Sequence, residues 1–207
     1  MVKKGYLRLN DDQHDGIKQD VYSSFDTIPD LEIWRQFKTG NESAFIHIYK
    51  TYFKSLYNFG LQFSKDTHLV EDSIQDLFID IRRTRKKLSD TTSIKLYLYK
   101  AIRRKILRSI KSSRKRLWDG SIEEGNNFHF TFSYEHHLIS QQLNEEKIER
   151  LNRALQTLPK RQREVIYYFF YEQMGYLEIK EIMDFANIKS VRNKAYIALK
   201  TLRKSCE

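Results

Sequence analysis

Three aspartates recur at four-residue steps within residues 67–85: Asp72, Asp76 and Asp80. Residues four apart share one face of a helix, so their carboxylates would line one side of it. Carboxylate oxygens are the ligands that Mg²⁺ prefers, and Mg²⁺ supports phosphoryl chemistry. However, all three acids lie on one helix, and no second segment supplies matching carboxylates or a base. We therefore expect a solvated or partner-binding face without metal or cofactor, and a metal-dependent nuclease is an alternative.

The strongest charge signal in the chain lies in residues 82–116. This segment holds fifteen Lys and Arg against one acid, Asp90, whereas the whole chain carries a net charge of +10. A helix from about Ser93 would bury an apolar face and expose a row of cations, with Tyr97 and Tyr99 among them. Cations hold phosphates, and an adjacent aromatic ring can stack on an exposed base. The segment indicates nucleic-acid binding, and binding to an anionic membrane is the alternative.

Residues 158–204 have the pattern of short helices that end in a basic one. Pro159 suits the first turn of a helix because its missing N–H would be unpaired there. Gly175 and residues 184–187 then interrupt the apolar periodicity, and residues 189–204 contain no acid. This order is typical of a helix-turn-helix, whose last helix enters the major groove and reads bases through Arg and Asn. A solvated basic face is the alternative.

The same stretch carries a series of motifs. They are Leu158-Pro159-x-Arg161-Gln162-Arg163-Glu164-Val165, Glu178-Ile179, Ser190-Val191-Arg192-Asn193, Ala198-Leu199 and Leu202-Arg203. Together they resemble the C-terminal promoter-reading domain of extracytoplasmic-function sigma factors. Lys180 stands where that family usually has a small residue, and the turn before Ser190 is one residue longer than usual. The resemblance implies binding to the minus-thirty-five promoter element by Lys189, Ser190, Arg192, Asn193, Lys194 and Tyr196.

A further motif, Glu71-Asp72-x-x-Gln75-Asp76-x-Phe78, lies on the acidic helix. It resembles the helix of the same sigma family that binds core RNA polymerase. An acidic and amide face with one exposed aromatic ring suits a basic, partly apolar partner. The resemblance implies polymerase binding by Glu71, Asp72, Gln75, Asp76 and Phe78.

The basic helix carries Tyr97-Leu98-Tyr99 followed by Arg103-Arg104. This resembles the sigma-family segment that melts and reads the minus-ten element, usually an aromatic-Leu-Tyr motif followed by Arg-Asn. Arg104 replaces the usual Asn, which shifts the preference toward phosphate contact. The loop at 88–92 offers small polar groups that could hold one unstacked base. The resemblance implies minus-ten binding by Lys95, Tyr97, Lys100, Arg103, Arg104 and Arg108.

Composition and chain order place these motifs in two helical domains. Only two Pro and seven Gly occur in 207 residues, which favours helices with short connections over an all-β fold. We predict an all-α protein of two small helical domains joined by a flexible linker, the second a helix-turn-helix. The predicted parts are a disordered tail (1–28), a sigma region 2-like domain (29–116), a linker (117–136) and a sigma region 4-like domain (137–207).

The chain is expected to be cytoplasmic, without direct membrane insertion. No apolar run approaches the ~20 residues that span a bilayer, and the N-terminus lacks a signal-peptide core. The single cysteine, Cys206, cannot form an internal disulfide, which fits a reducing compartment. We predict a sigma factor that brings core RNA polymerase to promoter DNA, catalyses no reaction and, by resemblance to its family, binds an anti-sigma factor. The main alternative is a freestanding helix-turn-helix regulator that binds duplex DNA without polymerase.

Overall fold

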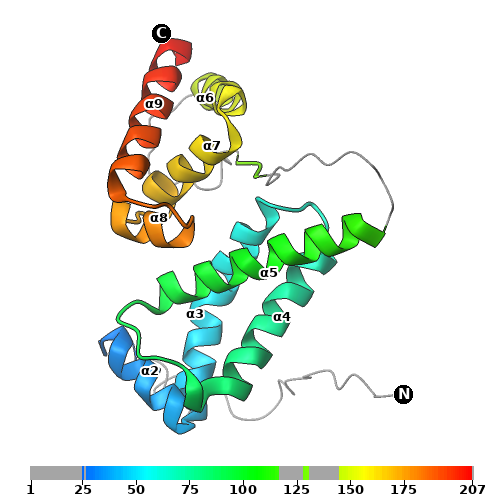
Figure 1. Ribbon diagram of the computed structural model, residues 1–207, viewed down its shortest axis with the longest axis vertical. Coiled ribbons are helices and arrows are strands. Elements are labelled where there is room, and N and C mark those ends of the chain that lie inside the picture. The colour runs from blue at the N-terminus through cyan, green and yellow to red at the C-terminus, as the bar shows by residue number, and fades with distance from the viewer. Residues whose placement is uncertain (1–24, 26, 117–127, 131–144, 207) are drawn as a thin grey trace.

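The computed structural model describes residues 25, 27–116, 128–130 and 145–206. These residues form helices, and no strand occurs among them (Figure 1), so the all-α prediction is confirmed. The predicted tail, apart from Phe25 and residues 27–28, lies outside this part of the chain. So do residues 137–144 of the predicted second domain. No described helix is both long enough and apolar enough to span a membrane.

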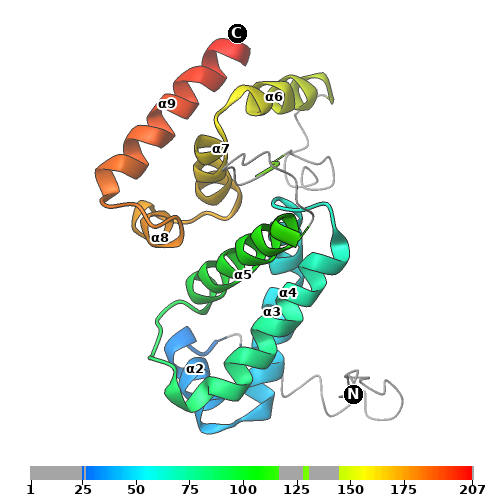
Figure 2. The same ribbon diagram turned by 45° about the vertical axis from the view of Figure 1, so that its right-hand side comes forward.

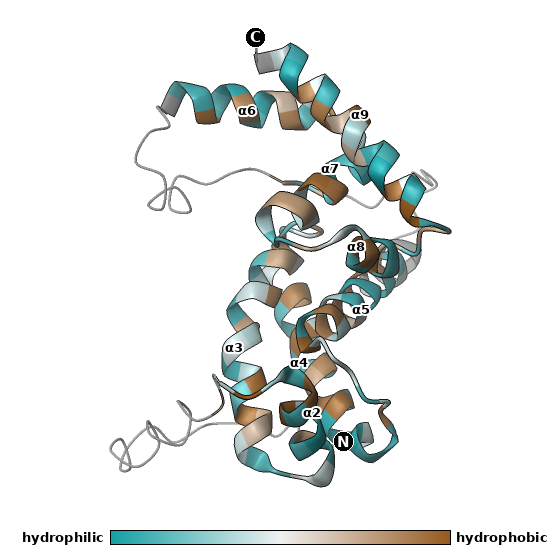
Figure 3. Ribbon diagram, turned by 90° about the vertical axis from the view of Figure 1, so that its left-hand side faces the viewer, coloured by the Kyte–Doolittle hydropathy of each residue, from teal (hydrophilic) through white to brown (hydrophobic). Residues whose placement is uncertain are grey.

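The helices form two groups, which lie one above the other in Figure 1. The N-terminal group consists of α2 (Asp30–Thr39), α3 (Glu42–Leu61), α4 (Thr67–Thr84), the 3₁₀ turn η1 (Arg85–Lys87) and α5 (Ile94–Arg116). The C-terminal group consists of α6 (Glu145–Thr157), α7 (Lys160–Ile166), the π-helical turn η3 (Tyr167–Tyr171), α8 (Tyr176–Ile182) and α9 (Ile188–Cys206). Figure 3 shows apolar and polar positions alternating along α6 and α9, as expected for amphipathic helices.

Local signals set most helix ends. Gly40 ends α2 in the left-handed conformation (φ 104°), which glycine adopts without steric cost. Asn41 then begins α3, where its side chain accepts hydrogen bonds from Ser43 N and Ala44 N. Pro29 holds the N-cap position of α2, and Asp30 is its first residue. The Asp30 carboxylate accepts a hydrogen bond from Ile94 N at 2.7 Å, so it caps α5.

Close packing joins the helices of the N-terminal group. A Cβ built on Gly60 of α3 would lie 2.5 Å from the side chain of Val70 on α4 and 3.1 Å from that of Ile106 on α5. Only a glycine lets the three helices approach this closely. Trp34 of α2 is fully buried and donates its indole N–H to Ser89 O, which fixes the loop before α5.

One arginine organises the C-terminal group. The Arg163 guanidinium is buried and donates to the carbonyls of Leu155, Gln156 and Leu158, which lie at the end of α6. Carbonyls at the end of a helix lack the usual donors from a following turn, and the Arg163 side chain supplies donors to these three. Arg163 also donates to Phe128 O, and thereby ties residues 128–130 to this group.

The two groups share one continuous core. Phe59 of α3 lies 5.9 Å from Tyr167 and 5.7 Å from Tyr168 between ring centroids, and both tyrosines belong to the turn that follows α7. Phe128 and Phe130 are buried against Tyr167 at 5.4 and 5.0 Å. The predicted linker (117–136) therefore contains a short segment that packs as core, which the sequence interpretation missed.

Candidate functional site

The acidic face of α4 is open to solvent. Asp72, Gln75 and Asp76 are exposed and Glu71 is half-buried. Among the residues that the structure describes, none forms an ion pair with either aspartate. The face is therefore available to a partner in the arrangement seen here.

Phe78, the predicted exposed aromatic contact of this face, is buried with 3% of its surface exposed. Its ring packs against Phe45 and Tyr49, at 6.2 and 4.9 Å between centroids. The prediction of an exposed Phe78 is therefore wrong, because the ring faces the core between α3 and α4. Ile79, which is 53% exposed, follows Asp72 and Gln75 by seven and four residues. It thus supplies the apolar contact on that face.

Asp80 does not belong to a metal site with the other two aspartates. Its carboxylate pairs with Lys105 Nζ at 2.6 Å and with Arg83 Nη2 at 3.0 Å. The hydrogen bond from Lys105 is the main reason that the pKa of Asp80 is lowered. No cluster of three or more metal-binding side chains occurs within the described residues. The nuclease alternative therefore has no supporting geometry there.

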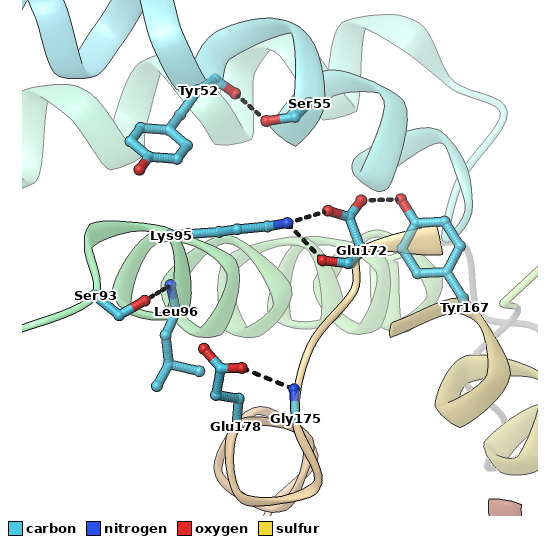
Figure 4. Close-up of polar contacts among 9 residues, drawn as sticks. All are labelled: Tyr52, Ser55, Ser93, Lys95, Leu96, Tyr167, Glu172, Gly175 and Glu178. Atoms are coloured by element: carbon cyan, nitrogen blue, oxygen red, sulfur yellow. Dashed lines mark hydrogen bonds and ion pairs between the residues drawn. The ribbon is translucent and has the colours of Figure 1, made fainter. Parts of the chain in front are cut away.

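The cations of α5 face acids of the C-terminal group. Lys95 Nζ lies 2.9 Å from a Glu172 carboxylate oxygen and donates to Glu172 O at 2.8 Å (Figure 4). Arg104 reaches Asp184 at 3.4 Å. Lys100 Nζ lies 4.0 Å from a carboxylate oxygen of Glu181 on α8, which runs next to α5 in Figure 2.

Arg103 and Glu164 form the most buried of these pairs. Arg103 Nε donates to Glu164 Oε1 at 2.6 Å, and their side chains are 11% and 0% exposed. The Tyr168 hydroxyl donates to the same oxygen at 3.3 Å. Burial is the largest influence and acts to lower the pKa of Arg103, but the charge of Glu164, its hydrogen bond and the neighbouring Tyr168 and Asp184 together outweigh burial, and the net pKa is raised. The guanidinium therefore stays charged, and Arg103 is not accessible to DNA here.

The two tyrosines of the basic helix differ in position. Tyr97 is half-buried, and its ring packs against Trp34 at 4.8 Å. Tyr99 is fully buried, 4.9 Å from Phe59, and burial raises the pKa of its hydroxyl. The interpretation of Tyr99 as a base-stacking ring is therefore wrong, since it is a core residue. Arg108, further along the helix, is exposed.

The loop before α5 is fixed by α2. Asp90 pairs with Lys38 Nζ at 2.6 Å and with Arg35 Nε at 3.0 Å. The hydrogen bond from Lys38, followed by that from Arg35, lowers the pKa of Asp90. Asp90, the one acid of the basic segment, thus fixes the loop to α2, and its charge is neutralised by two cations of that helix.

The start of α9 forms a surface pocket. It is lined by Asn187, Lys189, Ser190, Arg192, Asn193 and Tyr196. Five of these are predicted minus-thirty-five residues, whereas the sixth predicted residue, Lys194, is half-buried and does not line the pocket. The additional residue, Asn187, accepts hydrogen bonds from Ser190 N and Oγ at 2.8 and 2.9 Å. An Asn just before a helix is a visible capping signal.

Three charged residues of the 158–165 motif have structural partners. Arg161 donates to Met183 O and lies over the Phe185 ring, so it supports the turn between α8 and α9. Arg163 caps α6, and Glu164 pairs with Arg103. This motif therefore builds the scaffold that presents α9.

Comparison with known proteins agrees with this geometry. The family described as sigma-70 region 2 matches residues 48–116, which span most of α3, α4 and α5. The chain is 27% identical over 157 residues to the ECF RNA polymerase sigma factor SigM of Bacillus subtilis (strain 168), covering 75% of this chain and 92% of SigM. Residues 48–116 thus match the sigma-70 region 2 family, and the chain is similar over three quarters of its length to an extracytoplasmic-function sigma factor.

Two solved structures have the same fold as this chain. CnrH, in complex with the cytosolic domain of CnrY, aligns with a TM-score of 0.55 and 17% identity over 84% of this chain and 95% of CnrH. RpoE of Bartonella quintana, in complex with the anti-sigma factor NepR, aligns with a TM-score of 0.56 and 16% identity over 78% and 95%.

No feature of the sequence predicted which acids pair with the cations of α5. Arg103 and Glu164 are 61 residues apart, and Arg104 and Asp184 are 80 apart. Local periodicity reports only which face of a helix is polar, and it says nothing about a partner on another element.

Proposed function

We propose that this protein is a sigma factor that directs core RNA polymerase to specific promoters and starts transcription there, while it catalyses no reaction itself. The observation that carries this proposal is the combination of three surfaces on one chain. They are an open acidic face on α4, a row of cations on α5 and a pocket at the start of α9 that is lined by basic and amide side chains. A freestanding DNA-binding regulator would not need the first of them.

The α4 face is the proposed contact with core polymerase. Asp72, Gln75 and Asp76 point to solvent, with Ile79 beside them. Carboxylates around one exposed aliphatic side chain complement a basic, partly apolar surface. Glu71 is proposed to widen this contact at its edge, and Phe78 to support the face from below.

The pocket at the start of α9 is the proposed reader of the minus-thirty-five element. N-terminal residues of a recognition helix are the ones that reach base edges in the major groove. Arg192 lies over the Tyr176 ring at 5.5 Å, which orients its guanidinium at the helix start. Arg192 and Asn193 are the proposed base contacts, because Arg and Asn form bidentate hydrogen bonds with guanine and adenine.

The proposed minus-ten surface is the α5 face with Lys95, Tyr97, Lys100, Arg103, Arg104 and Arg108. Its cations would hold backbone phosphates, and Tyr97 would stack on a base held by the loop at 88–92. Tyr97 is suited to this role because its ring is half-buried and braced by Trp34.

An anti-sigma factor is the proposed regulatory partner. CnrH is crystallised with the cytosolic domain of CnrY, and RpoE with the anti-sigma factor NepR. By analogy, a protein partner of this type would bind the present chain in the cytoplasm and compete with polymerase for it.

Transcription from a promoter library tests the proposal. Purified chain and core polymerase should together produce defined start sites that neither produces alone. Sequence-specific duplex binding without any polymerase-dependent start site would instead identify a freestanding regulator.

A further inference from the structure

The cations of residues 82–116 lie on both sides of the loop at 88–92. The proposed minus-ten surface uses those on α5, which follow the loop. Five further cations precede the loop, at the end of α4 and in the 3₁₀ turn η1: Arg82, Arg83, Arg85, Lys86 and Lys87. The loop proposed to hold an unstacked base is therefore bordered by basic residues at both ends.

The three arginines of this set have partners within the chain. Arg82 and Arg83 form ion pairs of 2.9 and 3.0 Å with acids of α3 and α4. Arg85 Nη1 donates to Arg82 O, and the Arg85 guanidinium lies next to Gly40, the residue that ends α2. These arginines therefore stabilise the fold and fix the turn against α2.

Lys86 and Lys87 differ from the arginines. Both lysines are exposed, and within the described ranges neither side chain has an ion-pair or hydrogen-bond partner. Asp90, the one acid of the adjacent loop, already pairs with Lys38 and Arg35 of α2, so it does not neutralise them. The two lysines of η1 are thus available to an anionic ligand.

The turn that carries the two lysines has a defined position. Its backbone closes through a hydrogen bond from Leu88 N to Arg85 O at 3.3 Å, and the Trp34 indole donates to Ser89 O just beyond it. Figure 1 shows the chain passing from the lower end of α4 along α2 to the start of α5. The lysines therefore precede the loop at a fixed place, while Tyr97 follows it on α5.

Backbone phosphate is the anion that this arrangement fits. A nucleotide whose base is held in the loop has a phosphate on each side of its sugar, and the α5 cations lie at only one end of the loop. A lysine ammonium binds phosphate as a point charge, without the two-point geometry that arginine favours. Two such charges at the other end can hold the strand where it leaves the loop.

We infer that Lys86 and Lys87 bind backbone phosphates of the melted promoter strand where it leaves the base-holding loop, so that the single-strand contact runs from α5 across the loop to η1. This inference rests on the proposed function, since it assigns a promoter element to α5 and the loop. Phosphate contacts carry no sequence information. The two lysines therefore raise the affinity for melted DNA and leave the choice of promoter unchanged.

The test measures binding of the complex of the full chain with core polymerase to two fluorescein-labelled DNAs. Both are built on a promoter that the library experiment yields: a duplex that ends before the minus-ten element, and the same duplex with a single-stranded tail through that element. The variant carries Lys86→Gln with Lys87→Gln. A matched control carries Lys65→Gln with Lys147→Gln, which removes the same charge from exposed positions after α3 and on α6.

The η1 variant should bind the tailed DNA about fivefold more weakly than the control does at low salt, because two phosphate contacts are lost. The slope of log affinity against log salt should become shallower by about 1.4, since each single-strand phosphate contact contributes about 0.7. Both proteins should bind the tailless duplex equally. Lys86→Arg with Lys87→Arg, which keeps both charges, should retain the wild-type affinity and salt slope.

Equal binding of the tailed DNA by the η1 variant and the control would overturn the inference. Equal losses on the tailed and tailless DNAs would overturn it as well, because the lysines would then contact duplex phosphates. A lower affinity of the η1 variant for core polymerase would instead assign the lysines to the polymerase contact. All three results leave the proposed function standing, whereas a library without polymerase-dependent start sites removes the proposed function and this inference with it.

Discussion

The charged faces of α4 and α5 lie on neighbouring helices, yet the α4 face is open to solvent and the α5 face is paired with acids. Asp72 and Asp76 on α4 point to solvent, and no ion-pair partner for them occurs in the described part of the chain. Lys95 and Arg103 on α5 are held by acids that follow them by more than 60 residues. The face proposed for a protein partner is open, whereas the face proposed for DNA is covered. Tertiary packing, rather than local composition, decides which charged surface is free to bind.

The largest effect is expected when the most buried pair across the two groups is broken. Arg103→Ala would leave the Glu164 carboxylate, which is 0% exposed, without its counter-ion. Removing one partner of a buried pair costs about 3–5 kcal/mol of unfolding free energy. Urea denaturation measures this loss. Arg104→Ala, which breaks an exposed pair of the same surface, is the control and should cost less than about 1 kcal/mol. Equal costs for the two variants would show that Glu164 is not buried as described.

The next effect concerns the open face. Asp76→Arg should place a charge of the wrong sign against a basic polymerase surface, which costs several kcal/mol of binding free energy. Folding should be unaffected, because Asp76 is exposed. Affinity for core polymerase is the measurement, and Glu149→Arg on α6 is a control with the same change of charge. Binding at the wild-type level by Asp76→Arg would remove α4 from the polymerase contact.

A third prediction separates base reading from phosphate binding on α9. Arg192→Ala should cost about 1–3 kcal/mol of binding free energy and relax the preference at one base position. Lys200→Ala should weaken binding evenly across sequences, because a lysine on the exposed side of the helix contacts phosphates only. Binding to a library of duplexes resolves the two patterns. Uniform losses from both variants would mean that the helix only holds the backbone.

Tyr97 gives a test of the covered face. Base stacking on an aromatic ring contributes ~1–3 kcal/mol per base, which is comparable to the cost of exposing one base. Tyr97→Ala should therefore impair strand opening more than closed-complex binding. Permanganate probing of thymines, with core polymerase and a cognate promoter, measures opening. Intact strand opening by Tyr97→Ala, together with loss of all promoter binding by Lys100→Ala with Arg104→Ala, would contradict base capture. The α5 face would then be an electrostatic contact only.

The smallest effect is expected at Asp80, the α4 acid that pairs with α5. Its pKa in the folded chain is below the ordinary value of 3.8, chiefly because Lys105 donates a hydrogen bond to it. The resulting stability is present above pH 3.8 and is lost as the pH falls through the lowered folded pKa. Since 43% of the side chain is exposed, Asp80→Asn should cost only about 0.5 kcal/mol at pH 7. The difference between variant and wild type should disappear in acid denaturation below pH 3.8. A constant difference across this range would contradict the assignment.

Helix positions and the helix-turn-helix were predictable because they depend on local spacing. The expected helices at 67–85 and from about 93 correspond to α4 and α5. The burial of Phe78 and Tyr99 was not predicted. An aromatic residue at the edge of an apolar stripe can face the core or the solvent, and the packing of the neighbouring helix determines which. Phe128 and Phe130 were missed because they lie in a polar stretch without periodicity, so their burial depends on a cavity that other elements create.

The contacts between α2 and the loop at 88–92 bear on how this protein can be redesigned. Trp34 and Lys38 bind Ser89 O and Asp90, and Asp30 caps Ile94 at the start of α5. A helix with no ligand contact of its own thus sets the shape of the proposed base-holding loop. A graft that moves only the loop and α5 into a related protein would lose this support. The transferable module for promoter specificity is therefore α2, the loop and the first turns of α5 together.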